Sequence, residues 1–167
     1  LNMIEWALNK GFPPSMVLAD SWFGVGPFVK GLRRLQLSYI LEVRSSYKVR
    51  VPCKKPKLTK TGNKSKNQFD TIPLPRFFNT INAVFQCGFA ADPFAEKCEK
   101  VLYHTKTATV RLNSIPGKHR IVHSIDPRTQ TSKYLITDQL TWEASKILSI
   151  YSLRWVIEEF FRNAKQL

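Results

Sequence analysis

The chain has 167 residues, of which 43% are hydrophobic and 12% aromatic, which suits one folded domain with a core. Lysine and arginine number 26 against 12 acidic residues, and the net charge of +14 favours a polyanionic partner such as nucleic acid. No run is apolar enough to cross a membrane and no signal peptide opens the chain, which argues against a membrane partner. Three cysteines without CxxC spacing fit a reducing cytosol, so we expect a cytoplasmic location.

The first 38 residues predict a helix, a short strand and a second helix. Apolar residues recur at helical intervals over residues 2–10, and the apolar run Met16–Ala19 predicts a buried strand that ends at Asp20. Pro27 is a favourable first residue for an amphipathic helix over residues 27–35. Taken alone, Asp20 is a strand-end or capping carboxylate.

The middle of the chain, residues 39–137, predicts a β-rich region. Residues 72–78 are predicted to be extended but not a central strand, because Pro73 and Pro75 cannot donate ladder hydrogen bonds. The other segments have β-like or alternating patterns and predict strands over residues 39–43, 48–51, 81–89, 100–112, 120–125 and 133–137.

A basic loop over residues 48–67 interrupts this region. It carries a dense group of lysines, which includes Lys54, Lys55, Lys57 and Lys60, and residues 53–67 are almost free of apolar side chains. A block of like charges is commonly a solvated tip, and in a DNA-binding protein the same tip can lie along phosphates. Both interpretations stay open, and neither provides base-specific recognition.

The C-terminal part, residues 138–167, predicts a long helical segment with Thr141 or Ser145 as its N-cap. On a helix with about 100° per residue, Arg154, Glu158 and Lys165 fall within roughly 60° of Tyr151. A phenol, a guanidinium, a carboxylate and an ammonium therefore share one stripe. Glu159 lies about 100° from Glu158 and misses this stripe.

The spacing Tyr-x2-Arg-x3-Glu-x6-Lys resembles the Tyr-Arg-Glu-Lys signature of DDE transposases of bacterial insertion sequences, specifically the insertion-sequence-four family. The flanking Arg154-Trp155 and Lys165-Gln166, and the segment MVLADSWFG around Asp20, are also similar to that family. The resemblance extends from Val17 to Gln166 and implies an α/β, ribonuclease-H-like core interrupted by a β-rich insertion domain. The core would comprise residues 1–38 and 138–167, and the insertion residues 39–137.

The resemblance implies that Asp20 and Glu158 are catalytic and hold divalent metal, Mg²⁺ or Mn²⁺, in a two-ion site. Tyr151, Arg154 and Lys165 would bind DNA phosphates. The implied reaction is phosphodiester hydrolysis at transposon ends followed by strand transfer into target DNA, with a homodimer in the DNA complex. We expect the Asp20 and Glu158 carboxylates to lie within about 8 Å of each other, close enough to share an ion site.

The sequence departs from the family pattern in one respect. The family's first catalytic aspartate precedes the second on an earlier strand, and none of the 19 residues before Asp20 is an aspartate. We therefore expect a fragment or a decayed gene product with an incomplete active site at its N-terminal side. The alternatives are an inactive DNA-binding remnant of a transposase and an unrelated basic nucleic-acid-binding domain.

His119 and His123 also suggest a zinc site together with Cys87 and Cys98. A strand over these histidines would separate their imidazoles by about 13 Å, which is too far for one zinc ion. The spacing therefore disfavours zinc.

Overall fold

A computed structural model describes residues 1–12, 14–53, 69–90 and 100–164 of the chain. The described helices are α1 (Asn2–Asn9), α2 (Gly26–Arg34), α3 (Leu74–Asn79), α4 (Ala144–Ser152) and α5 (Arg154–Ala164). The strands are β1 (Val17–Ala19), β2 (Tyr39–Val43), β3 (Lys48–Pro52), β4 (Phe69–Pro73), β5 (Phe85–Ala90), β6 (Lys100–Leu112), β7 (Lys118–Ile125) and β8 (Ser132–Thr137).

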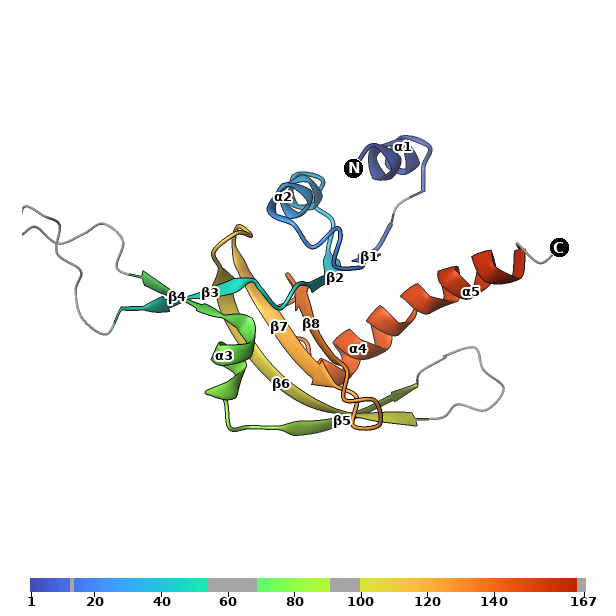
Figure 1. Cartoon of the computed structure of the whole chain (residues 1–167). Helices are drawn as coiled ribbons and strands as arrows, with labels where there is room; N and C mark the ends of the chain where they lie inside the picture. The colour runs from blue at the N-terminus through green and yellow to red at the C-terminus, as the bar shows by residue number, and fades with distance from the viewer. Residues whose placement is uncertain (13, 54–68, 91–99, 165–167) are drawn as a thin grey trace, which may run out of the picture.

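All eight of these strands belong to one mixed sheet (Figure 1). Its order is β1-β2-β8-β7-β6-β3-β4, and β5 pairs with β6 outside this path. β1 and β2 are parallel, whereas every other pair is antiparallel. The fold is therefore mixed α/β, and it is compatible with a ribonuclease-H-like core.

The two faces of the sheet carry separate hydrophobic cores. On one face, Val29 and Leu32 of α2 and Phe78 of α3 pack among buried strand residues such as Leu41 and Ile136. On the other face, α4 packs through its buried apolar side chains on the strands, and this cluster comprises Ile40, Val122, Leu135, Ala144, Ile147, Leu148 and Tyr151. Strand residues alternate between the two cores, as the period of two in a pleated strand requires.

Most predicted strands are confirmed, and residues 39–43 and 100–112 match β2 and β6 at both ends. Residues 74–78 were predicted to be extended and this is wrong, because they form most of α3. Pro75 lies in the first turn of α3, where its missing N–H would have no helical partner in any case. Phe78 is fully buried and anchors the helix, while β4 ends the sheet as an edge strand.

The predicted N-caps of the last helical segment are both wrong. α4 begins after Glu143, which lies between Thr141 and Ser145 and makes no side-chain capping hydrogen bond. Burial of the α4 side chains, rather than a cap, therefore determines where this helix begins. The segment is also divided, since Leu153 separates α4 from α5.

The strands of the predicted insertion are continuous with the strand that precedes Asp20. β2 pairs with β1, and β8 pairs with β2, so residues 39–137 extend the sheet that β1 begins. The proposed boundaries at residues 38 and 138 stay predictions. The basic loop lysines Lys54, Lys55, Lys57 and Lys60 lie outside the described residues.

The two histidines that suggested zinc lie in the core and have other partners. His119 is fully buried, with Nδ1 3.1 Å from the Tyr39 hydroxyl and Nε2 3.1 Å from the Pro116 carbonyl oxygen. His123 stacks on Tyr134, with ring centroids 4.5 Å apart. Cys98 lies outside the described residues.

Candidate functional site

Asp20 directly follows β1, as predicted. Its Oδ1 accepts a hydrogen bond of 3.0 Å from the Trp22 backbone N–H, which closes a tight turn after the strand. Val17, Leu18 and Ala19 pair in parallel with Tyr39, Ile40 and Leu41. Continued by one residue, this register brings Asp20 alongside Glu42 of β2.

The turn after Asp20 packs directly on the backbone of Glu42. A Cβ atom at Gly24 would lie 2.2 Å from the Glu42 carbonyl oxygen, so only glycine fits this position without a backbone shift. On β2, Ile40 belongs to the core that faces α4, and Glu42 lies two residues further along the same face. Glu42 is therefore an acidic side chain near Asp20 on the α4 side of the sheet.

Tyr151 connects α4 to this part of the sheet. Its side chain is buried, and its hydroxyl donates a hydrogen bond of 3.1 Å to Oε2 of Glu42. Lys133 of β8 also approaches Glu42, with its Nζ 3.9 Å from the same oxygen. Burial raises the pKa of Tyr151 well above its usual range, and the negative charge of Glu42 raises it further. Tyr151 is therefore a neutral donor and not a base.

Arg154 lies at the start of α5 beside two aromatic rings. Its guanidinium carbon is 5.6 Å from the centroid of the Tyr151 ring and 5.1 Å from that of Trp155. NH1 of Arg154 forms an ion pair with Oε1 of Glu158, one helical turn further on. Burial alone would lower the pKa of Arg154, but Tyr151 and Glu158 outweigh it and the pKa is raised.

The guanidinium retains unused hydrogen-bonding capacity. The Arg154 side chain is 16% exposed, and its Nε is buried without a hydrogen-bond partner among the described residues. A guanidinium carries five N–H donors, so the ion pair with Glu158 leaves donors of Arg154 available for another acceptor. A phosphate oxygen is an acceptor of the right kind, because guanidinium groups bind phosphate through several N–H donors.

The structure therefore brings together three of the four stripe residues, and adds Glu42 to them. The expectation that Arg154 is partly buried beside Glu158 is confirmed. Lys165 lies outside the described residues, and so does the side chain of Glu159. The functional roles of Asp20, Tyr151, Arg154 and Glu158 stay predictions.

Glu42 was not predicted as part of the site. The available signal was a lone carboxylate within the apolar strand YILEV, on the same face as Ile40. Burial of a carboxylate without a partner costs free energy, so its presence in this strand indicates a specific contact. The partner, Tyr151, is 109 residues away in the sequence, and strand alternation alone does not identify it.

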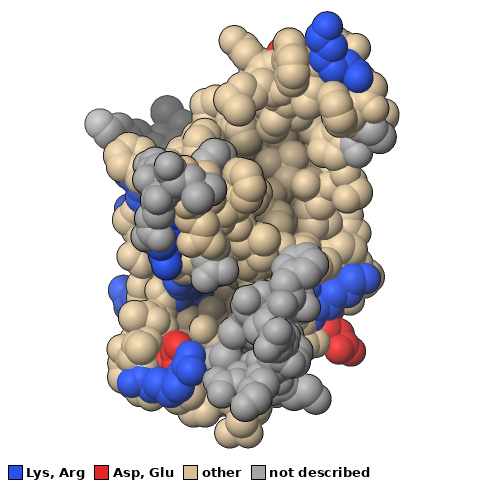
Figure 2. All heavy atoms as spheres, turned by 90° about the vertical axis from the view of Figure 1, so that its right-hand side faces the viewer, with Lys and Arg blue, Asp and Glu red and all other residues tan. Residues whose placement is uncertain are grey.

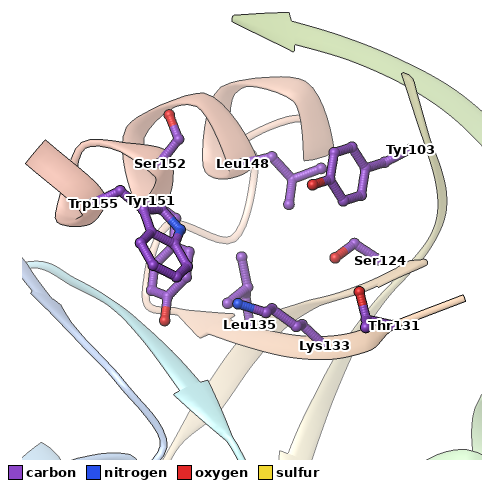
Figure 3. Close-up of a pocket in the computed structure, with 9 residues that line it drawn as sticks. All are labelled: Tyr103, Ser124, Thr131, Lys133, Leu135, Leu148, Tyr151, Ser152 and Trp155. Carbon is purple, nitrogen blue, oxygen red and sulfur yellow. The ribbon is translucent and has the colours of Figure 1, made fainter. Parts of the chain in front are cut away.

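A cavity of about 290 Å³ lies between the α4–α5 junction and the sheet. Figure 3 shows the rings of Tyr151 and Trp155 directed from this junction toward Lys133 of β8. Lys133 Nζ is 5.6 Å from the centroid of the Trp155 ring, and hydroxyls such as that of Ser124 contribute to the wall. The cavity thus combines aromatic, cationic and hydroxyl groups next to Tyr151.

One face of the molecule is hollowed, and few charged side chains are seen at its centre (Figure 2). Figure 2 views the side of the molecule on which α5 ends, and the described Lys and Arg side chains lie there in separate groups around a central hollow. On this face, the described Lys and Arg side chains therefore do not form a single patch (Figure 2).

Three carboxylates are candidate ligands for a hard divalent ion. The described residues contain no group of three His, Cys, Asp or Glu residues close enough to hold a metal. Asp20, Glu42 and Glu158 nevertheless offer hard carboxylate oxygens, and Mg²⁺ commonly uses one or two carboxylates completed by water and substrate phosphates. The donor chemistry thus fits Mg²⁺ or Mn²⁺.

Comparison with known families finds a similarity in the N-terminal part of the chain. Residues 1–76 match the sequence model of a family described as DDE superfamily endonuclease. This segment includes Asp20 and Glu42, and it ends before the stripe on α4 and α5. Endonucleases of the DDE superfamily act on DNA and generally use divalent metal ions. Comparison with curated proteins gives no match.

No helix in the described ranges has both the length and the apolar character needed to span a membrane.

Proposed function

We propose that this chain is part of a DDE transposase of the insertion-sequence-four type. The observation that carries the proposal is the contact chain from Glu42 through Tyr151 and Arg154 to Glu158. The match of residues 1–76 to DDE superfamily endonucleases supports it independently, because that match does not include the stripe residues. The proposed reaction is metal-dependent hydrolysis of phosphodiesters at transposon ends, followed by strand transfer.

Asp20 and Glu158 are the proposed metal ligands, since both bear carboxylates at the family's acidic positions. When bound, Mg²⁺ or Mn²⁺ supplies Lewis-acid stabilisation of the charge on phosphodiester oxygens. Glu158 is 41% exposed and paired with Arg154, so it is accessible to an ion and held in one orientation. Asp20 is held by its hydrogen bond to the Trp22 N–H, which leaves its second oxygen available among the described contacts.

Arg154 and Tyr151 have different proposed tasks. Arg154 would bind a backbone phosphate through the donors that Glu158 does not use, as charge-assisted hydrogen bonds. The hydroxyl of Tyr151 has one hydrogen-bond donor, which it uses toward Glu42, so a hydrogen bond to phosphate would require that bond to be exchanged. In this arrangement Tyr151 mainly orients Arg154, whose guanidinium lies over its ring.

The metal proposal is tested by Mn²⁺ binding, followed by electron paramagnetic resonance with a DNA duplex present. Asp20→Asn and Glu158→Gln should each weaken Mn²⁺ binding about tenfold or more, because each removes a charged ligand. Glu143→Gln is the matched control, since Glu143 is exposed and makes no capping hydrogen bond. Unchanged Mn²⁺ binding in both site variants would overturn the assignment.

DNA binding without cleavage is the second candidate function. The chain has 26 basic and 12 acidic residues, and this excess of positive charge favours DNA binding, because binding to the phosphate backbone of DNA requires only cations. We expect the 167-residue chain to bind DNA with a steep salt dependence and not to cleave it, since the resemblance calls for a third acidic residue upstream of Asp20. Mg²⁺-dependent nicking by the purified chain would contradict that requirement.

A further inference from the structure

Three cationic side chains form a row across three neighbouring strands. In the sheet, Arg50 of β3 lies opposite Arg111 of β6, and Arg111 lies opposite Lys118 of β7. Residues that are directly opposite in adjacent strands project from the same face of the sheet. We call Arg50, Arg111 and Lys118 the basic row.

The basic row lies on an open part of the sheet. Val49 and Leu112, the neighbours of Arg50 and Arg111 in sequence, point into the core on the α2 and α3 side. The row therefore belongs to the opposite face, on which α4 packs. α4 covers a different part of that face, around Val122. All three side chains of the row are exposed.

The arrangement is unfavourable for the free protein. Like charges directly opposite each other on adjacent strands repel and destabilise a sheet. Among the described residues, no acidic side chain forms an ion pair with Arg50, Arg111 or Lys118. The residue that faces Arg50 from β4 is Thr71, a neutral hydroxyl donor. A row of cations that lacks intramolecular neutralisation is suited to an external polyanion.

We propose that the basic row is a binding site for the phosphodiester backbone of duplex DNA. Neighbouring strands are about 4.8 Å apart, so the row spans about 10 Å. Arginine and lysine side chains are long and flexible, so the three charged groups of the row can reach up to three backbone phosphates. The two arginines can each bind a phosphate through two N–H groups. The identification of the polyanion as DNA rests on the proposed function.

This site is separate from the stripe on α4 and α5 and from the predicted lysine loop. Its position on β3, β6 and β7 assigns a DNA contact to strands of the proposed insertion. It carries no base-reading geometry, so we expect it to bind backbone irrespective of sequence.

The test compares two variants of equal charge. One carries Arg50→Gln, Arg111→Gln and Lys118→Gln, and the control carries Lys10→Gln, Arg76→Gln and Lys146→Gln at exposed positions elsewhere. Binding to a fluorescent DNA duplex is measured by anisotropy at several salt concentrations. The row variant should reduce the slope of log K against log salt by about 2.7, or about 0.9 for each lost phosphate contact. When salt rises from about 50 to about 200 mM, the unmodified chain loses affinity by a certain factor. The corresponding factor for the row variant should be about 40-fold smaller.

Thermal unfolding of the free protein separates binding from a structural role. The row variant should unfold at the same or a higher temperature, because it loses like-charge repulsion. A lower unfolding temperature with no specific change in salt slope, or equal slopes in the row and control variants, would overturn the proposal. Tighter row-dependent binding of an RNA duplex than of the matching DNA duplex would overturn DNA as the partner. Failure of Mn²⁺ binding at Asp20 and Glu158 would leave these slopes unchanged, so the two proposals fail separately.

Discussion

The Tyr151 hydroxyl donates a hydrogen bond of 3.1 Å to Oε2 of Glu42, a residue 109 positions away in the sequence. This bond joins the end of α4 to the β2 residue alongside Asp20, and it fixes the ring on which the Arg154 guanidinium lies. Glu42 thereby couples the strand side of the candidate site to its helical side. The contribution of this hydrogen bond to the free energy of unfolding can be measured without an activity assay.

Tyr151→Phe should lower the free energy of unfolding by about 1.5–3 kcal/mol, because a hydrogen bond to a charged group is lost and Glu42 stays partly buried. Urea denaturation measures this change. In a double-mutant cycle with Glu42→Gln, the two substitutions should be non-additive. Tyr47→Phe serves as the control, since no hydrogen bond of the Tyr47 hydroxyl occurs within the described residues. Additive effects of the Tyr151 and Glu42 changes would contradict the coupling.

Gly24→Ala should destabilise the protein by about 1–3 kcal/mol, because the added Cβ would lie 2.2 Å from the Glu42 carbonyl oxygen and force a backbone shift. Gly88→Ala is a matched control, since its Cβ would meet the Leu102 side chain at an ordinary 3.6 Å. Equal midpoints of urea denaturation for the two variants would show that the turn after Asp20 does not pack on Glu42.

Acid should destabilise the fold through His119. Burial lowers the pKa of His119 from 6.5 to about 4, whereas the unfolded chain keeps the ordinary value. Between these values the unfolded state binds more protons, so stability is fully present above pH 6.5 and falls as the pH decreases toward 4. The loss should reach about 3 kcal/mol, measured by urea denaturation across this range. Constant stability over this interval in the native chain would contradict burial of a neutral His119.

Local patterns predicted those parts of the fold in which periodicity and burial agree. The run Tyr39–Val43 is apolar and β-like, and it forms β2 with unchanged bounds. The prediction of an extended segment over residues 74–78 was wrong because Pro73 and Pro75 are compatible both with an edge strand and with the first turn of a helix. Only the burial of Phe78 decides between these two structures. The helical wheel placed Arg154 beside Glu158 correctly, since both lie within α5.

The part of the site that the sequence did not predict depends on long-range pairing. Leu153 divides the helical segment, and the sequence has no proline or glycine at this point that would signal the break. Glu42 becomes part of the site only because β2 pairs with β1 and lies beneath Tyr151. No spacing in the sequence encodes either relationship.

Opposite effects on DNA binding should distinguish the two members of the ion pair on α5. Arg154→Ala should weaken binding of a DNA duplex about tenfold, because it removes a cation together with the N–H donors that can bind phosphate. Glu158→Ala should leave binding unchanged or strengthen it, since a negative charge is lost and the guanidinium is released. Anisotropy titrations at fixed salt measure both effects, with Glu143→Ala as the control for an acidic residue outside the site.

In an enzyme that contains the complete set of acidic residues, Glu158→Ala should abolish cleavage while DNA binding persists. Arg154→Ala should slow cleavage and weaken binding of the transposon end together, because the phosphate contact and the orientation of Glu158 are both lost. Arg154→Lys separates these two contributions. Lysine keeps the positive charge but lacks the planar guanidinium, whose N–H groups can contact Glu158 and phosphate together. Relative to Arg154→Ala, this variant should therefore restore DNA binding more than cleavage. If Glu158→Ala cleaved normally and Glu159→Ala did not, the assignment of Glu158 as the metal ligand would be wrong, and the helical register of the site with it.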